Sequence, residues 1–318
     1  MNHLKIALSG FWDRQEEDLT KLFPDIQFLS VDNTEIAEVN PDALVSMGRT
    51  SQALDDVFSN PEAMNKCSSL KWVHVSGAGV DEYFPYLENI NFAFTCGKVI
   101  QGPNVGDHGM ALLLALTRRI SWFLRGLEKG EVPRPTELAG KKAVIIGSGG
   151  LGMSLAERCS AFGMSIDIVT EIMPPILSFI DRVFYGDQLK DALPEADVVI
   201  VAAPGTPKTY HMINAAALAI MKDSAYIVNV SRGTAIDIEA LTASLADGRF
   251  EGVALDVTEP EPLSDDHPIR SFDRVIITPH AAGMSTTVER RFELICTNIR
   301  RFSSGDSLIN VVDKQTGF

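Results

Sequence analysis

Short runs of Val, Ile, Leu and Ala recur along the whole chain, separated by stretches with helical spacing, and this alternation limits the possible folds. The runs show little alternation of apolar and polar residues, which is typical of strands buried on both faces. A parallel sheet covered by helices satisfies this pattern, so the sequence predicts the α/β fold class. The expected strands are residues 4–8, 43–47, 72–75, 143–146, 166–169, 198–203, 225–230, 253–256 and 275–278.

The chain has 318 residues, a length that suggests two domains. One long helical pattern runs from residue 104 to about residue 124, and a second runs from about 285 to 302. Two long helices on either side of a central block are typical of connections between a split outer domain and an inserted one. We therefore expect one domain from residues 1–102 and 285–318, and another from residues 103–284.

Charge and cysteine content exclude several classes of protein. There are 28 Lys and Arg against 42 Asp and Glu, a net charge of −14 without any long basic run, which argues against a nucleic-acid partner. The longest apolar run, residues 110–116, is far below the ~20 residues that span a bilayer, so no membrane partner is expected. We read no signal peptide at the N-terminus, and Cys67, Cys96, Cys159 and Cys296 form no CxxC pair. Free thiols in the cytoplasm suit this pattern better than disulfides or a zinc site.

A glycine-rich turn lies where a dinucleotide-binding fold requires one. Gly147, Gly149 and Gly152 form a G-x-G-x-x-G after an apolar strand and before a helical pattern, with Gly150 and Leu151 between them. Gly147 permits the tight turn, Gly149 lets the backbone approach a pyrophosphate, and Gly152 lets helix and strand pack closely. The free N–H groups at the start of the helix then face the anion. A dinucleotide site is therefore predicted here.

The acid that binds the ribose hydroxyls in such folds is displaced by one residue. Thr170 holds the expected position at the end of the next strand, and Glu171 follows it. Glu171 would favour NAD, because a carboxylate repels the 2′-phosphate of NADP, whereas Thr170 would tolerate that phosphate. No arginine follows until Arg182. We predict NAD as the cofactor, with NADP possible and with a solvated loop acid as the alternative role for Glu171.

Polar residues follow three later strands. Arg232, Glu261 and His280 lie in loops after the strands at 225–230, 253–256 and 275–278, and Asp256 ends the second of these. Ligands of open parallel sheets bind at the carboxyl ends of the strands, so these side chains are expected to converge on one site.

The chain resembles the D-isomer-specific 2-hydroxyacid dehydrogenases over nearly its whole length. The motifs that carry the resemblance stand in one order: VSGAGVD (75–81), GPNVGDH (102–108), GSGGLG (147–152), AAPGTPKT (202–209), NVSRG (229–233), ALDVTEPEPL (254–263), TPHAAG (278–283) and NVVDKQTG (310–317). The intervals of 29 residues from Arg232 to Glu261 and 19 from Glu261 to His280 look like the glyoxylate/hydroxypyruvate reductase branch. This resemblance implies two Rossmann-like or flavodoxin-like domains, of which residues 103–284 bind the dinucleotide and the other domain binds substrate.

The resemblance also assigns catalytic roles. His280 would protonate the carbonyl oxygen during reduction, since a histidine trades a proton near neutral pH. Glu261 would bind the other ring nitrogen and orient the ring, with Glu259 as a less favoured alternative. Arg232 would bind the substrate carboxylate through its forked donors. The implied reaction interconverts a small 2-oxo acid and its D-2-hydroxy acid.

Further residues are implied as ligand contacts. Ala78 and Gly79 would bind the substrate carboxylate from the side opposite Arg232, and Ser76 and Gly77 of the same turn are expected to contact substrate, with a tight turn alone as the alternative. Separately from the resemblance, Arg49 is a candidate to reach a distal anionic group of the substrate. Asp256 would bind the nicotinamide carboxamide or cap a turn. The remaining expected cofactor contacts are Ala203, Pro204, Val230, Ser231 and Gly283.

Some expectations concern structure rather than ligands. His74 and His108 are predicted to be structural, and Asn104 is expected to cap its helix. The stretch between residues 119 and 140 lacks the tryptophan-containing segment common before the glycine loop in this family. A homodimer formed through the cofactor domain is expected from the family. The alternative to an enzyme is a non-catalytic scaffold of the same fold that senses NAD(H).

Overall fold

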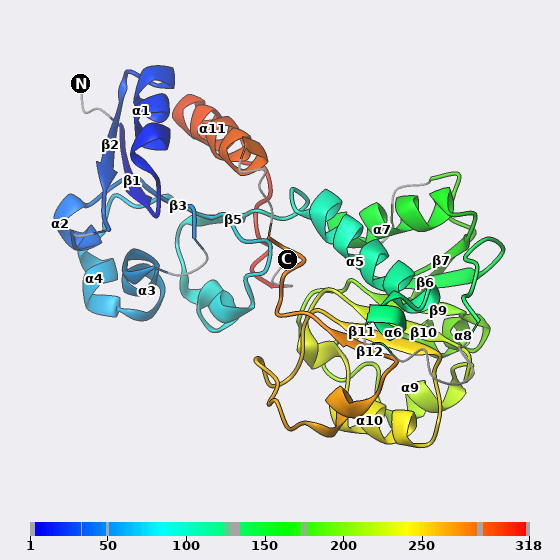
Figure 1. Cartoon of the computed structure of the whole chain (residues 1–318). Helices are drawn as coiled ribbons and strands as arrows, with labels where there is room; N and C mark the ends of the chain where they lie inside the picture. Colours follow the sequence, from blue (N-terminus) through cyan, green and yellow to red (C-terminus); the bar gives the residue numbers. More distant parts are fainter. Residues whose placement is uncertain are drawn as a thin grey trace. The chain divides into compact units, whose positions relative to one another are not determined.

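The computed structural model describes residues 4–32, 34–48, 51–124, 126, 134–172, 174, 177–284 and 289–315. The chain divides into two compact units (Figure 1). We call Met1–Ile100 with Thr286–Phe318 the terminal unit, and Gln101–Ser285 the central unit. Each contains one sheet whose described strands all run parallel, so the predicted α/β class is confirmed.

The terminal unit has a five-stranded sheet in the order β2-β1-β3-β4-β5, which is the flavodoxin-like order. Its strands are β1 (Leu4–Ser9), β2 (Ile26–Ser30), β3 (Ala43–Ser46), β4 (Trp72–Val75) and β5 (Ala93–Cys96). Its helices are α1 (Asp13–Leu22), α2 (Ile36–Val39), α3 (Gln52–Ser59), α4 (Pro61–Lys66), the 3-10 helix η1 (Asp81–Asn89) and α11 (Glu289–Ser304).

Alternate residues of these strands face two hydrophobic layers, because successive side chains of a strand point to opposite faces. On one face Ile6 and Val45 pack with Ile295 and Ile299 of α11 and with Leu19 of α1. The other face of the sheet is covered by α3 and η1. The C-terminal segment runs beside β5, where the backbone N–H of residue 312 donates to the carbonyl of residue 94.

The central unit has a seven-stranded sheet in the order β12-β11-β10-β9-β6-β7-β8. Its strands are β6 (Lys142–Ile146), β7 (Ser165–Thr170), β8 (Arg182–Tyr185), β9 (Val198–Val201), β10 (Tyr226–Asn229), β11 (Gly252–Leu255) and β12 (Val275–Ile277). Its α-helices are α5 (Gly102–Thr117), α6 (Ile120–Leu124), α7 (Gly150–Ala161), α8 (Leu189–Ala192), α9 (Ala215–Ile220) and α10 (Ile238–Ala246). The 3-10 helices are η2 (Gly186–Gln188), η3 (Leu193–Glu195), η4 (Gly233–Ala235) and η5 (Pro268–Ser271).

Helices cover both faces of the central sheet. Ala143 and Ile145 of β6 face the layer that contains α5 and α7, whereas Val144 and Ile146 face the layer of α8, α9 and α10. The strand order changes direction at β6, since β7 lies on one side of it and β9 on the other. In open α/β sheets a ligand binds outside the carboxyl ends of the strands at such a switch point.

Two local expectations are wrong. The helix expected over residues 104–124 is divided, because Arg119 takes a left-handed backbone conformation (φ 59°) between α5 and α6. Arg119 is only 9% exposed, and its side chain is held by the carbonyl and carboxylate of Glu251, so contacts outside the helix compensate for this break. Asn104 does not cap its helix: Gln101 stands at the cap, and the Asn104 amide donates to the carbonyl of Ala282 (2.9 Å).

No helix in the described part of the chain combines the length and the apolar character needed to cross a membrane.

Candidate active site

The six loops that follow β6, β7, β9, β10, β11 and β12 leave the central sheet at the same edge, because all seven strands are parallel. We call this the carboxyl edge. The glycine-rich turn, Thr170 with Glu171, and the loops with Arg232, Glu261 and His280 all start from it. The sheet thus brings to one edge residues that are more than a hundred positions apart in the sequence.

The glycine-rich turn has the geometry that a dinucleotide needs. Gly147 has a φ of 108°, and a Cβ atom there would lie 2.7 Å from the carbonyl oxygen of Ala202. A Cβ on Gly152 would lie 1.9 Å from the carbonyl oxygen of Gly147, so helix and strand approach closely. A Cβ on Gly149 would meet nothing within 4 Å. This open space beside the N-terminus of α7, with Gly150 and Leu151 in its first turn, fits a pyrophosphate.

The two residues expected at the ribose differ in their surroundings. Thr170 is buried, and its hydroxyl is 2.6 Å from that of Ser148 and also donates to the carbonyl of Ile172 (3.0 Å). Glu171 is exposed, and its carboxylate is 3.1 Å from the ammonium group of Lys208. Between these two residues, Glu171 has the side chain that is accessible to a ligand.

His280 and Glu261 meet directly. The Nδ1 atom of His280 lies 2.6 Å from a carboxylate oxygen of Glu261, and the two side chains are 34% and 42% exposed. A carboxylate accepts hydrogen bonds, so Nδ1 carries the proton in this pair and Nε2 is left to exchange one. The arrangement suits general acid–base chemistry at Nε2.

Asp256 holds the loop that carries His280. Its carboxylate, 1% exposed, accepts hydrogen bonds from the hydroxyl of Thr278 (2.5 Å) and the backbone N–H groups of Ala281 (2.8 Å) and Ala282 (2.9 Å). Its carbonyl accepts from the backbone N–H of His280, whose φ of 54° is left-handed. These contacts correspond to the turn-capping role, one of the two roles expected for Asp256. The other role, a contact between Asp256 and the nicotinamide carboxamide, stays a prediction.

Arg232 is held by the strand end before it. Its carbonyl accepts from the amide of Asn229 (2.9 Å), and its guanidinium donates to the carbonyl of Ser231 (2.7 Å). A Cβ on the next residue, Gly233, would lie 2.0 Å from the carbonyl oxygen of Thr258. The Arg232 loop therefore packs tightly against the start of the segment that carries Glu261.

Several expected cofactor contacts are part of the core. Ala203 and Val230 are buried, and Ser231 is buried with its hydroxyl on Asn229. Pro204 is exposed and Gly283 is half-buried. These five residues lie in the loops of the carboxyl edge, and their contacts with a cofactor stay predictions.

The expected substrate loop belongs to the terminal unit and follows β4. Ser76 and Gly77 are buried, and the Ser76 hydroxyl donates to the carbonyl of Ser46 (3.0 Å), whereas Ala78 and Gly79 are half-buried. Arg49 lies outside the described residues.

Sequence reasoning missed the contributions of three residues of the central unit, Lys208, His211 and His108, to the contacts at its carboxyl edge. His211 lies 3.0 Å from Glu259, and Lys208 pairs with Glu171. His108, expected to be structural, has its Nε2 atom 3.2 Å from the carboxylate of Asp256. His74, also expected to be structural, is not part of this edge: it is buried in the terminal unit beside Thr95 (2.8 Å), and burial lowers the pKa of its imidazole to about 3.

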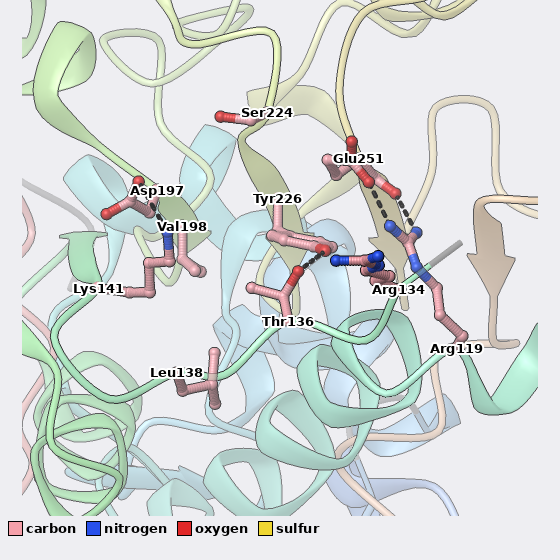
Figure 2. A pocket seen from close by; sticks show the side chains of 10 residues that line it. All are labelled: Arg119, Arg134, Thr136, Leu138, Lys141, Asp197, Val198, Ser224, Tyr226 and Glu251. Atoms are coloured by element: carbon pink, nitrogen blue, oxygen red, sulfur yellow. Dashed lines mark hydrogen bonds and ion pairs between the residues drawn. The ribbon is translucent and has the colours of Figure 1, made fainter. Parts of the chain in front are cut away.

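A hollow of about 390 Å³ lies at the opposite, amino edge of the central sheet (Figure 2). Its lining includes Asp197, Tyr226 and Glu251, which stand at or next to the first residues of β9, β10 and β11. Figure 2 shows Arg119 reaching Glu251 and the hydroxyl of Thr136 beside that of Tyr226. None of these residues belongs to the loops of the carboxyl edge, so the hollow is separate from the candidate active site.

Among the described residues, no group of His, Cys, Asp and Glu side chains is arranged to hold a metal ion. The four cysteines are free and buried. Burial raises the pKa of the Cys159 thiol to about 12, so it stays protonated near neutral pH.

Comparison with known proteins agrees with this geometry. Residues 110–282 match the family model of the D-isomer specific 2-hydroxyacid dehydrogenase, NAD binding domain. A glyoxylate reductase from Thermofilum pendens is 31% identical over 273 residues, which are 80% of this chain and 78% of that protein. An uncharacterized protein from the proB 3′ region of Corynebacterium melassecola is 33% identical over 83% of this chain and 90% of its own length.

Solved structures show the same fold. A D-isomer specific 2-hydroxyacid dehydrogenase from Xanthobacter autotrophicus Py2, in complex with NADPH and MES, superposes with a TM-score of 0.83 at 24% identity and covers 100% of both chains. This likeness in fold agrees with the family match. The chain belongs to the D-isomer specific 2-hydroxyacid dehydrogenases, the NAD(P)-dependent oxidoreductases that interconvert 2-oxo acids and D-2-hydroxy acids.

Proposed function

We propose that this protein reduces a small 2-oxo acid to the D-2-hydroxy acid, with His280, Glu261 and Arg232 as the catalytic residues. The observation that carries the proposal is the His280–Glu261 pair, 2.6 Å apart, at the same edge of the sheet as the glycine-rich turn. An imidazole whose Nδ1 is held by a carboxylate presents Nε2 as the acid, and such proton transfer contributes about 10²–10⁴-fold to a rate.

Each residue has one task in this proposal. His280 donates a proton from Nε2 to the carbonyl oxygen, and takes it back in the reverse reaction. Glu261 accepts the hydrogen bond from Nδ1 of His280 and so fixes the ring. Arg232 binds the carboxylate and polarises the neighbouring 2-oxo group. The bound nicotinamide supplies the hydride.

The division of labour between the two units is part of the proposal. The central unit binds the dinucleotide, a role supported by the geometry of the glycine-rich turn and by the exposed carboxylate of Glu171. The loop formed by Ser76, Gly77, Ala78 and Gly79 binds the substrate carboxylate, a role supported by its place at the carboxyl end of β4 in the terminal unit. Arg49 is proposed to reach a distal anionic group of the substrate.

Steady-state assays test this function. Purified protein is mixed with NADH and, in separate reactions, glyoxylate, hydroxypyruvate, pyruvate and phenylpyruvate, and the oxidation of NADH is followed. We expect turnover with at least one of them and a product of D configuration. Measurable NADH binding without turnover of any 2-oxo acid would instead support a dinucleotide-sensing scaffold.

Cofactor choice follows from the surroundings of Glu171. Its carboxylate is suited to the ribose hydroxyls and repels a 2′-phosphate, which favours NAD. The ammonium group of Lys208, 3.1 Å away, offsets part of this repulsion. We therefore propose that NAD is preferred and that NADP also binds, a ranking that parallel titrations with NADH and NADPH measure.

We also propose a homodimer formed through the central unit. Support comes from α6, where Ile120, Phe123 and Leu124 expose 46%, 42% and 82% of their surface. Light scattering should give twice the chain mass of 34.7 kDa, and a mass of 34.7 kDa would contradict the proposal.

We further propose that the protein works in the reducing cytoplasm, a location supported by its four free thiols and tested by cell fractionation.

A further inference from the structure

We propose that His211 and Glu259 form a positioning pair that holds the Arg232 loop and the Glu261 segment in register with each other. The inference rests on the proposed function, because its effect on the rate passes through Arg232 and Glu261. Neither His211 nor Glu259 is required to touch the substrate.

His211 is connected to both segments. Its Nε2 atom lies 3.0 Å from the carboxylate of Glu259, and its backbone N–H donates to the carbonyl of Thr234 (2.8 Å), two residues after Arg232. The backbone at His211 has a φ of 45°, a conformation that costs free energy for a residue with a side chain. The ring also stacks on Tyr210, with centroids 4.0 Å apart and planes 13° apart. These contacts together fix one position of the imidazole.

The second connection runs between the two segments themselves. A Cβ on Gly233 would lie 2.0 Å from the carbonyl oxygen of Thr258 and 2.7 Å from the backbone nitrogen of Glu259. The hydroxyl of Thr258 donates to the carbonyl of Pro260 (2.8 Å). The backbone that carries Arg232 is therefore in contact with the backbone that leads to Glu261, and His211 spans the same junction.

Two histidine–glutamate pairs thus stem from one short segment. Glu259 pairs with His211, and Glu261, two residues later, pairs with His280. A Glu259 carboxylate that lost its donor would become a second acceptor near the Glu261 segment and would compete for cationic groups there. The His211–Glu259 pair keeps Glu259 engaged and leaves His280 to Glu261.

Substitutions at His211 separate positioning from folding. His211→Phe keeps an aromatic ring against Tyr210 but removes the donor to Glu259, whereas His211→Gln keeps an N–H donor. The matched control is His267→Phe, which breaks another histidine–glutamate pair of the central unit, His267 with Glu239 at 3.3 Å. Each variant is compared with wild type in kcat and KM for the best 2-oxo acid, in NADH affinity by fluorescence and in Tm.

We expect His211→Phe to lower kcat/KM about tenfold, the scale of one hydrogen bond to a charged group. His211→Gln should recover to within about threefold of wild type, and His267→Phe should match wild type. NADH affinity should stay within about twofold throughout. Unchanged kcat/KM in His211→Phe, or equal losses in His211→Phe and His211→Gln, would overturn the inference.

A spectroscopic readout makes the test independent of turnover. The proton on Nδ1 of His280, bonded to Glu261, should give a strongly downfield nuclear magnetic resonance signal. We expect this signal to broaden or move upfield in His211→Phe and to return in His211→Gln, and an unchanged signal in His211→Phe overturns the inference. A wild-type protein that shows the signal but reduces no 2-oxo acid contradicts the proposed function alone.

Discussion

Replacing Glu261 with Gln removes the charge beside His280 and keeps a side chain of the same shape. The pair is short, 2.6 Å, and hydrogen bonds to charged groups contribute about 1.5–3 kcal/mol. Because the two side chains are 34% and 42% exposed, solvent screens the charge, and we take the lower half of that range. A loss of about 1.5–2 kcal/mol corresponds to roughly a 10–30-fold decrease in kcat/KM, at 1.36 kcal/mol per factor of ten.

The assay is NADH oxidation with the best 2-oxo acid across a range of pH. Glu261→Gln should lower kcat/KM while NADH affinity stays unchanged, since Glu261 contacts His280 and is not proposed to contact the dinucleotide. Glu239→Gln, which alters the His267 pair, is the matched control and should behave as wild type. A Glu261→Gln variant as active as wild type at every pH would refute the reasoning.

Three other predictions concern cofactor binding and stability. Lys208→Met should weaken NADPH binding about threefold to fivefold, the scale of one exposed ion pair, with NADH within twofold in fluorescence titrations; equal losses for both would contradict it. Gly149→Ala should keep the wild-type Tm but bind NADH at least about tenfold more weakly. Gly152→Ala should weaken NADH binding and also lower Tm, because of these two positions only Gly152 has backbone atoms where the new Cβ would lie. A lower Tm for Gly149→Ala would count against this. Because His74 has a pKa of about 3 when folded and about 6.5 when unfolded, the unfolded chain binds a proton first and stability falls as pH drops from 6.5 towards 3, by roughly 2–3 kcal/mol at pH 4.5. Urea unfolding at pH 7 and 4.5 should show a smaller loss for His74→Asn, and equal losses would contradict the reasoning.

The sequence predicts the strands in the middle of each sheet well, and of the edge strands it predicts β12 but not β2, β5 or β8. Strands such as β9 (Val198–Val201) are buried on both faces and read as continuous apolar runs. The strands β2 (Ile26–Ser30) and β8 (Arg182–Tyr185) lie at sheet edges and are partly exposed, so their apolar content is too low to distinguish them from loops. The strand β5 (Ala93–Cys96), also at a sheet edge, is not predicted because its sequence, AFTC, contains none of the Val, Ile and Leu residues that mark the predicted strands.

The sequence predicts those parts of the candidate site that follow from a single rule of sheet topology. The rule that parallel strands end at one edge predicts that the loops of Glu261 and His280 come together, and the structure shows the two side chains paired. The His211–Glu259 pair and the contact of Asn104 with Ala282 join segments that are distant in the chain, and no local pattern marks them. The break at Arg119 depends likewise on Glu251, 132 residues away.

The rate of hydride transfer in His280→Ala tests the central claim most directly. Wild type and variant are each mixed with NADH and the best 2-oxo acid in a stopped-flow instrument, and the affinity for NADH is titrated separately. The account predicts transfer at least about a hundredfold slower in His280→Ala, with unchanged NADH affinity, because the variant lacks the acid and keeps the glycine-rich turn. Transfer as fast as in wild type would contradict it.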